Sequence, residues 1–376
     1  MSISIVPTQM RKAPKAPMTR RKGPRTPHLA KVGLILTLGG SLAMGACGKA
    51  DDADEFRQGV PFHEDVAMVI PGGGAQQGAL TVTPGAGGAA HANEVTQVQA
   101  ALLGEKAELY RTTRDITGMV NGATVAVLTL VKTITEFPPS TVATDVAVWG
   151  PHTNALSENT WRLTVNRVSR GVFTYVLEAK PRGTADPMYL TILSGQHTVT
   201  NPGARRRARL PAYGSGTFLL DWDNAQKLPE HDANVGKINI TYSRPAPTAN
   251  VDIGATFTKV MDKDTGMLID AQYDYAETPG QGGSFQFTLT KNAIVTTPAL
   301  ETLSVRSRWQ ENGAGRSDVK FVGGDLGALE ASANECWSAG DDGFLSDYMT
   351  NSYGDPAKMW GAQTACVFLT ADYAMF

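Results

Sequence analysis

From Trp149 onward, largely apolar side chains recur at every second residue, and this alternation constrains the fold more than any other feature of the sequence. Two examples are Trp161-Leu163-Val165 and Phe173-Tyr175-Leu177, where polar residues fill most positions between. Successive side chains of a β-strand point to opposite faces, so each run predicts a strand with one apolar face. Six further runs repeat the pattern: Phe218-Leu220-Trp222, Ile238-Ile240-Tyr242, Val251-Ile253-Ala255-Phe257, Met267-Ile269-Ala271-Tyr273-Tyr275, Phe285-Phe287-Leu289 and Leu303-Val305-Ser307-Trp309.

Turn-forming residues separate these runs, as in Ser169-Arg170-Gly171 and Asn312-Gly313-Ala314-Gly315. One-sided strands with short connections predict an antiparallel meander, curved into a half-barrel or closed into a barrel. The segment Asp262-Lys263-Asp264-Thr265-Gly266 superficially resembles the opening of a calcium loop. It lacks the later acidic ligand and lies between two predicted strands, so we interpret it as a hairpin turn.

The segment before the strands predicts helices. Asn93 is a good N-cap with Glu94 in the first turn, and Asn121-Gly122 is a fitting stop. Ala123–Glu136 is rich in β-branched residues and suits a helix or a strand; we favour a helix. Apolar residues at helical spacing support an amphipathic helix from Asn93 to about Val120: Val95, Val98, Leu102, Leu109 and Ile116. We therefore predict an α+β domain over residues 93–376, in which N-terminal helices cover the apolar face of the meander.

The N-terminus has the features of an export signal. Eight basic residues and no acidic residue precede Cys47, and Val32–Ala46 is uncharged with Gly45-Ala46 at its end. A basic region, a short apolar region and small residues at the end are typical of a secretory signal, here residues 1–46. The start of this signal is either Met1 or Met18, because Met18-Thr19-Arg20-Arg21-Lys22 opens a more usual basic region.

A cysteine directly after such a site resembles the lipobox of bacterial lipoproteins. The resemblance covers only the signal, and it implies that the thiol of Cys47 is acylated and anchors the protein to a membrane of the cell envelope. Gly48 stands where some lipoproteins carry an aspartate for inner-membrane retention, so the outer membrane is favoured. The alternative is an ordinary secretory signal that leaves Cys47 as a free thiol.

Residues 47–92 are rich in Asp, Gly and Ala and sustain no apolar period, which predicts a flexible tether. Without residues 1–46, the chain keeps 26 of its 34 basic residues against 36 acidic ones, a net charge of −10. Nucleic acid is therefore not expected as a partner, because phosphate binding needs a basic surface. The one dense basic run, Arg205–Arg209, suits either an anionic headgroup or polysaccharide, or a charged edge strand; we favour the edge strand.

Two cysteines, Cys336 and Cys366, remain after Cys47, and an exported setting favours a disulfide between them over two buried thiols. The sequence shows no catalytic motif and no spaced metal-ligand pair, so we expect neither an enzyme nor a metal or cofactor. A lipidated half-barrel resembles envelope carriers and sensors in architecture, which implies a carrier of a lipid or other hydrophobic ligand. The alternative is a structural or protein-interaction lipoprotein with a filled core.

Overall fold

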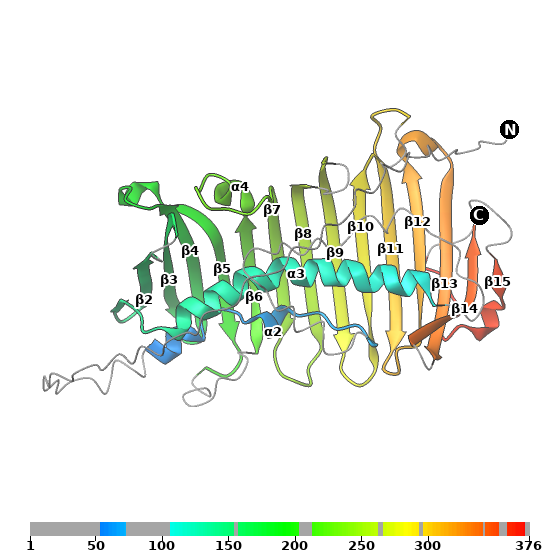
Figure 1. The fold of residues 1–376 in the computed structure, drawn as a ribbon. Helices are drawn as coiled ribbons and strands as arrows, with labels where there is room; N and C mark the ends of the chain where they lie inside the picture. Colours follow the sequence, from blue (N-terminus) through cyan, green and yellow to red (C-terminus); the bar gives the residue numbers. More distant parts are fainter. Residues whose placement is uncertain are drawn as a thin grey trace, which may run out of the picture. The chain divides into compact units, whose positions relative to one another are not determined.

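The computed structural model describes residues 53–72, 106–153, 157–202, 213–261, 266–292, 296–340, 343–352 and 359–372. Its main element is one open sheet of fifteen strands, each paired antiparallel with its neighbours in sequence (Figure 1). The strands are β1 (Thr141–Val142), β2 (Val146–His152), β3 (Asn159–Ser169), β4 (Val172–Pro181), β5 (Leu190–Val199), β6 (Gly214–Asp221), β7 (Lys237–Arg244), β8 (Val251–Met261), β9 (Leu268–Thr278), β10 (Gly282–Lys291), β11 (Glu301–Gln310), β12 (Gly315–Gly323), β13 (Glu330–Gly340), β14 (Gly343–Asn351) and β15 (Trp360–Gly361).

The predicted antiparallel meander is confirmed, and the sheet is open. Each alternating run lies in one of the described strands, with most of its side chains buried on one face. Two positions were predicted wrongly. Trp222 begins a short helix, α4 (Trp222–Ala225), because the Asp221 carboxylate accepts a hydrogen bond from the Asn224 N–H at 2.9 Å and ends β6. Met267 precedes β9 and is 41 % exposed.

The predicted runs lie in β3, β4 and β6–β11 and missed the other described strands, β1, β2, β5 and β12–β15. The environment of β12 shows one reason. Ser317 and Asp318 are consecutive in β12, yet both side chains are fully buried. One face of this strand lies under a helix and the other under the C-terminal segment, so buried polar side chains occupy both faces. A strand covered on both sides has no apolar–polar period to detect.

A single long helix, α3 (Glu108–Glu136), occupies the region for which two helices were predicted. The helical interpretation of Ala123–Glu136 is correct, but the stop at Asn121-Gly122 is wrong. Asn121 is buried, and its side chain bonds both backbone polar groups of Met68 instead of capping a helix end. The predicted start at Asn93 and the apolar positions up to Leu102 lie outside the described residues.

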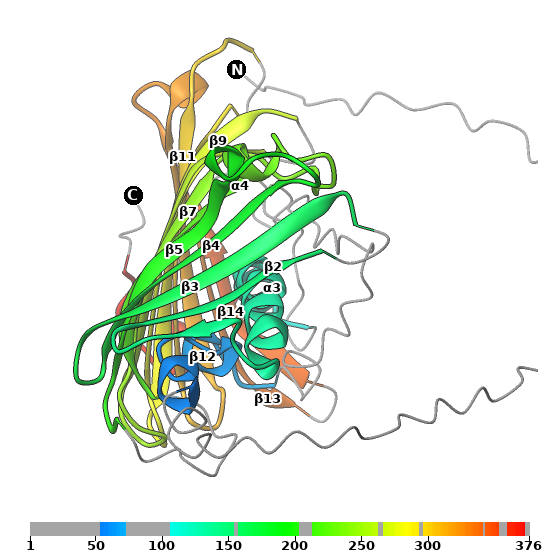
Figure 2. The ribbon, with the colours of Figure 1, turned by 90° about the vertical axis from the view of Figure 1, so that its left-hand side faces the viewer.

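α3 lies across one face of the sheet, as Figures 1 and 2 show. Near its N-terminal end the hydroxyl of Thr113 lies 2.6 Å from that of Ser307 on β11. At the other end, the indole N–H of Trp149 on β2 donates to the carbonyl of Phe137, just past the helix, at 2.9 Å. Among the described helices, none has the length and apolar character needed to cross a membrane.

Residues 53–72 also pack on this face, so the predicted tether is wrong for this part. A helical turn at 53–57 is followed by α2 (His63–Val66), and both lie beside the sheet (Figure 1). Five apolar side chains of the segment are 1 % exposed and belong to the core: Phe56, Val60, Val66, Met68 and Ile70. Their spacing changes from four residues to two within a short segment, so neither a helical nor a strand period is sustained and sequence periodicity did not reveal them. Residues 73–92 lie outside the described residues.

Candidate functional site

The structure places some of the predicted site residues and not others. Cys336 on β13 and Cys366 are joined by a disulfide with a Cα–Cα distance of 5.4 Å, as predicted. Cys47 and the basic run Arg205–Arg209 lie outside the described residues. The hairpin interpretation of residues 262–266 agrees with the pairing of β8 with β9 on either side, although residues 262–265 themselves are not described.

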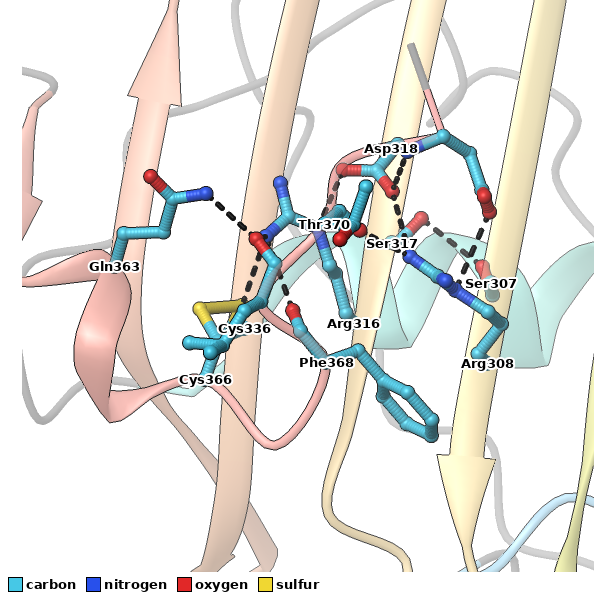
Figure 3. A network of polar contacts seen from close by, with 12 residues as sticks. Ser307, Arg308, Arg316, Ser317, Asp318, Cys336, Gln363, Cys366, Phe368 and Thr370 are labelled. Carbon is cyan, nitrogen blue, oxygen red and sulfur yellow. Dashed lines mark hydrogen bonds and ion pairs between the residues drawn. A yellow bond between two sulfur atoms is a disulfide. The ribbon is translucent and has the colours of Figure 1, made fainter. Parts of the chain in front are cut away.

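Beyond the disulfide, the C-terminal segment crosses the sheet face opposite α3 and covers a buried ionic network (Figure 3). Arg316 and Asp318 on β12 are almost fully buried and form an ion pair at 2.7 Å. The Arg316 guanidinium also donates to the carbonyl of Phe368 at 3.2 Å, and Asp318 accepts from the N–H of Asp372 at 2.9 Å. Burial raises the pKa of Asp318, while the N–H of Asp372 and the charge of Arg316 oppose this rise. The network fixes residues 366–372 against β11–β13.

A groove of about 720 Å³ lies beside this segment. Its floor consists of two rows of residues that run side by side across strands β7 to β11. One row pairs, strand by strand, Thr241, Gly254, Asp274, Gln286 and Arg306. The other pairs Ser243, Asp252, Ala276, Ser284 and Arg308 in the same way. Asp372 from the C-terminal segment completes the wall.

The two sides of this groove carry opposite charge. Asp252 and Asp274 stand on β8 and β9, and Arg306 and Arg308 stand together on β11. Arg308 already forms ion pairs with Asp318 at 3.4 Å and with Asp372 at 3.2 Å, so Arg306 supplies the positive charge on this side. Adjacent strands lie about 4.8 Å apart, so the rows place carboxylates and guanidinium groups roughly 10 to 15 Å from each other. Short side chains of Ala276 and Ser284 separate them. The arrangement suits a polar ligand that carries a cationic group and an anionic group at that spacing.

Gly254 deepens the groove because it has no side chain. A Cβ at this position would lie 2.9 Å from the hydroxyl oxygen of Thr241 and 3.5 Å from a carboxylate oxygen of Asp274. Glycine is unfavourable in a strand interior and often marks a place where another group approaches the backbone. The glycine therefore leaves backbone accessible between two polar side chains.

The opposite, α3-facing side of the sheet carries the hydrophobic core. Tyr110 of α3 packs against Phe344 at 4.5 Å and Trp337 at 5.7 Å between ring centroids. Tyr273 and Phe285 are buried, with ring centroids 4.8 Å apart.

A buried polar pair stands on the same side. His197 Nδ1 on β5 lies 2.6 Å from the hydroxyl oxygen of Tyr242 on β7. Gly216 on the intervening strand makes room, because its Cβ would lie 2.6 Å from that oxygen. Burial is the largest cause of a raised pKa for Tyr242. The pair is enclosed by the core, so we assign it a structural role.

Comparison of the chain with protein families, with curated proteins and with solved structures found no match. The groove is thus the candidate site on its geometry alone. Sequence reasoning missed it because its members are ordinary solvent-facing residues of predicted strands. The one available signal was Gly254, a glycine inside the alternating run Val251–Phe257.

Proposed function

We propose that this chain is an exported, lipid-anchored protein that binds a partner protein through the polar groove. The observation that carries the proposal is the contrast between the two faces of the sheet. The α3-facing side holds a cluster of buried aromatic and aliphatic side chains, whereas charged side chains of both signs border the groove on the other side. In this proposal, α3 and residues 53–72 are the cover of an ordinary hydrophobic core.

The groove fits an extended polypeptide better than a small apolar molecule. It runs across several strands, and its carboxylate and guanidinium sides match a segment that carries one basic and one acidic side chain. Opposite charges on one surface give orientation and specificity to such a contact. The export signal and Cys47 support an envelope location at the outer membrane. The expected carrier of a hydrophobic ligand is the alternative proposal, in which lipid would occupy the α3-facing side.

Photocrosslinking in cells tests the groove. Benzoylphenylalanine in place of Ser284, exposed on the groove floor, should capture a defined protein partner. The same residue in place of Gln196, which is exposed on β5 and does not line the groove, is the matched control. Arg306→Glu should abolish the crosslink from position 284. Equal capture from both positions would contradict a specific groove contact.

Native mass spectrometry of mildly purified protein tests the alternative. A filled core predicts no bound acyl chain beyond the covalent anchor, and no rise in Tm with added fatty acid. A noncovalent lipid retained at one equivalent, together with a rise in Tm, would instead support the carrier. Intact mass of the membrane-extracted protein tests lipidation of Cys47, and Cys47→Ser should release the protein from membranes.

A further inference from the structure

The first described residues are held firmly at one end of the sheet. Arg57 donates from Nε to the carbonyl of Thr135 at 2.7 Å and from its guanidinium to the carbonyl of Phe137 at 3.2 Å. Glu55 pairs with Arg167, near the end of β3, at 2.8 Å. These contacts place residues 54–57 beside the C-terminal end of α3 and the β3–β4 turn.

This placement leaves very little chain between the proposed anchor and the folded body. Cys47 and Ala53 are six residues apart in the sequence. A fully extended chain spans at most about 3.5 Å per residue, so Ala53 lies within roughly 20 Å of an acylated Cys47. The end of the sheet that holds residues 53–57 is therefore the end nearest the bilayer.

Two large apolar side chains are exposed at that same end. Phe137, just after α3, is 59 % exposed, and Val168, at the β3–β4 turn, is 63 % exposed. Arg170 is exposed in the same turn. Of the nearby acidic groups, Asp54 pairs with Arg57, and both Glu55 and Asp145 pair with Arg167, which reduces their repulsion from a lipid surface. Glu136, next to Phe137, is exposed. Apolar side chains beside arginine suit the boundary between headgroups and acyl chains.

We propose that this end of the sheet, marked by Phe137 and Val168, rests on the phospholipid bilayer that holds the anchor. The inference rests on the proposed acylation of Cys47, and it adds an orientation: the C-terminal end of α3 and the β3–β4 turn meet the membrane, and the β12–β13 connection points away. A short link to the anchor keeps the local concentration of bilayer high, so two apolar side chains are enough to set the orientation.

Depth-dependent fluorescence quenching tests the orientation in the full, membrane-extracted protein. With Cys47 acylated and Cys336 bridged to Cys366, a new cysteine is the only free thiol and takes an environment-sensitive fluorophore. Val168→Cys and Phe137→Cys report on the proposed contact. Leu329→Cys is the matched control, because Leu329 is 69 % exposed in the connection between β12 and β13. β3 and β12 are nine strands apart, or about 40 Å along the sheet.

The protein is reconstituted in phosphatidylcholine vesicles that contain brominated lipid. We expect at least twofold greater quenching at positions 168 and 137 than at position 329, and loss of quenching with Cys47→Ser. Equal quenching at all three positions in acylated protein would overturn the orientation and leave the anchor intact. A mass without the lipid would overturn the anchor and the orientation together. Thermal unfolding of each labelled variant confirms that it is folded.

Discussion

The side chain of Asn121 satisfies both backbone polar groups of Met68. The Met68 N–H donates to Oδ1 at 3.0 Å, and Nδ2 donates to the Met68 carbonyl at 2.9 Å. Both residues are buried, so water cannot replace these bonds. One amide in the middle of α3 therefore holds residues 53–72 against the helix, and this packing takes these residues out of the predicted tether.

Asn121→Ala should destabilise the fold by about 2 to 4 kcal/mol, because it leaves a buried N–H and a buried carbonyl without partners. Gly122→Ala is the matched control in the next position of the helix. A Cβ there meets no atom within 4 Å, so this change should stabilise by about 0.5 to 1 kcal/mol. Urea unfolding of both variants measures the difference; similar stabilities would contradict the assigned role of Asn121.

Glu335 should make stability depend on pH. Its buried carboxylate accepts hydrogen bonds from the N–H groups of Leu109 and of Glu108, the latter at 3.1 Å. Burial raises its pKa from 4.5 to about 7, and the donated N–H groups oppose the rise. Between pH 4.5 and 7 the native state therefore keeps a proton that the unfolded state has released. The contribution of Glu335 to the free energy of unfolding is therefore largest below pH 4.5. It falls by about 3 kcal/mol in total as the pH rises to 7.

Glu335→Gln should remove this slope, because glutamine stays neutral throughout. Urea unfolding at several pH values between 4 and 8 measures it. Glu330→Gln is the control on the same strand, since Glu330 is a partly exposed partner of Lys320 at 3.0 Å. An unchanged slope in Glu335→Gln would show that the pH dependence arises elsewhere.

The disulfide should contribute strongly to stability. It closes a loop between residues 30 apart, for which the chain-entropy model gives about 3 to 4 kcal/mol. The double variant Cys336→Ala/Cys366→Ala should lose this amount. Hydrogen exchange of residues 366–372 should also increase, because the bridge fixes the segment that covers Arg316 and Asp318. A reducing agent should destabilise the wild type and leave the double variant unaffected.

Gly216→Ala should be disruptive although alanine is a small residue. The new Cβ would lie 2.2 Å from the backbone oxygen of Gln196 and 2.6 Å from the hydroxyl oxygen of Tyr242. Overpacking of this kind costs about 1 to 3 kcal/mol. Gly118→Ala, in open space on α3, serves as the comparison and should not destabilise. Equal and small effects on Tm would mean that β6 accommodates the methyl group.

The sequence was informative wherever one face of a strand meets the core and the other meets solvent. Period two therefore identified strands such as β8, where Ile253 and Phe257 are buried and Thr256 is exposed. It failed where the environment differs: β12 is covered on both faces, and residues 53–72 form only two short helical turns joined by irregular chain.

The predicted helix end at Asn121-Gly122 was wrong for a related reason. Asn121 has the chemistry of a cap, but its partner is Met68, 53 residues away in the sequence. The candidate groove was also not predictable from local pattern, because its charges face one another only through the register of five strands. The disulfide was predictable because only two cysteines follow Cys47.

The order of strands in the sheet is the order of strands in the chain. Every pairing between the fifteen described strands thus joins neighbours along the sequence, and contacts that are local in sequence favour rapid folding. α3 behaves differently: Thr113 meets Ser307, 194 residues later. We therefore expect hairpins to assemble in sequence, while the helix can complete its docking only after β11–β13 have formed. Until then the apolar face of the growing sheet is open, and folding should be most vulnerable to aggregation during that interval.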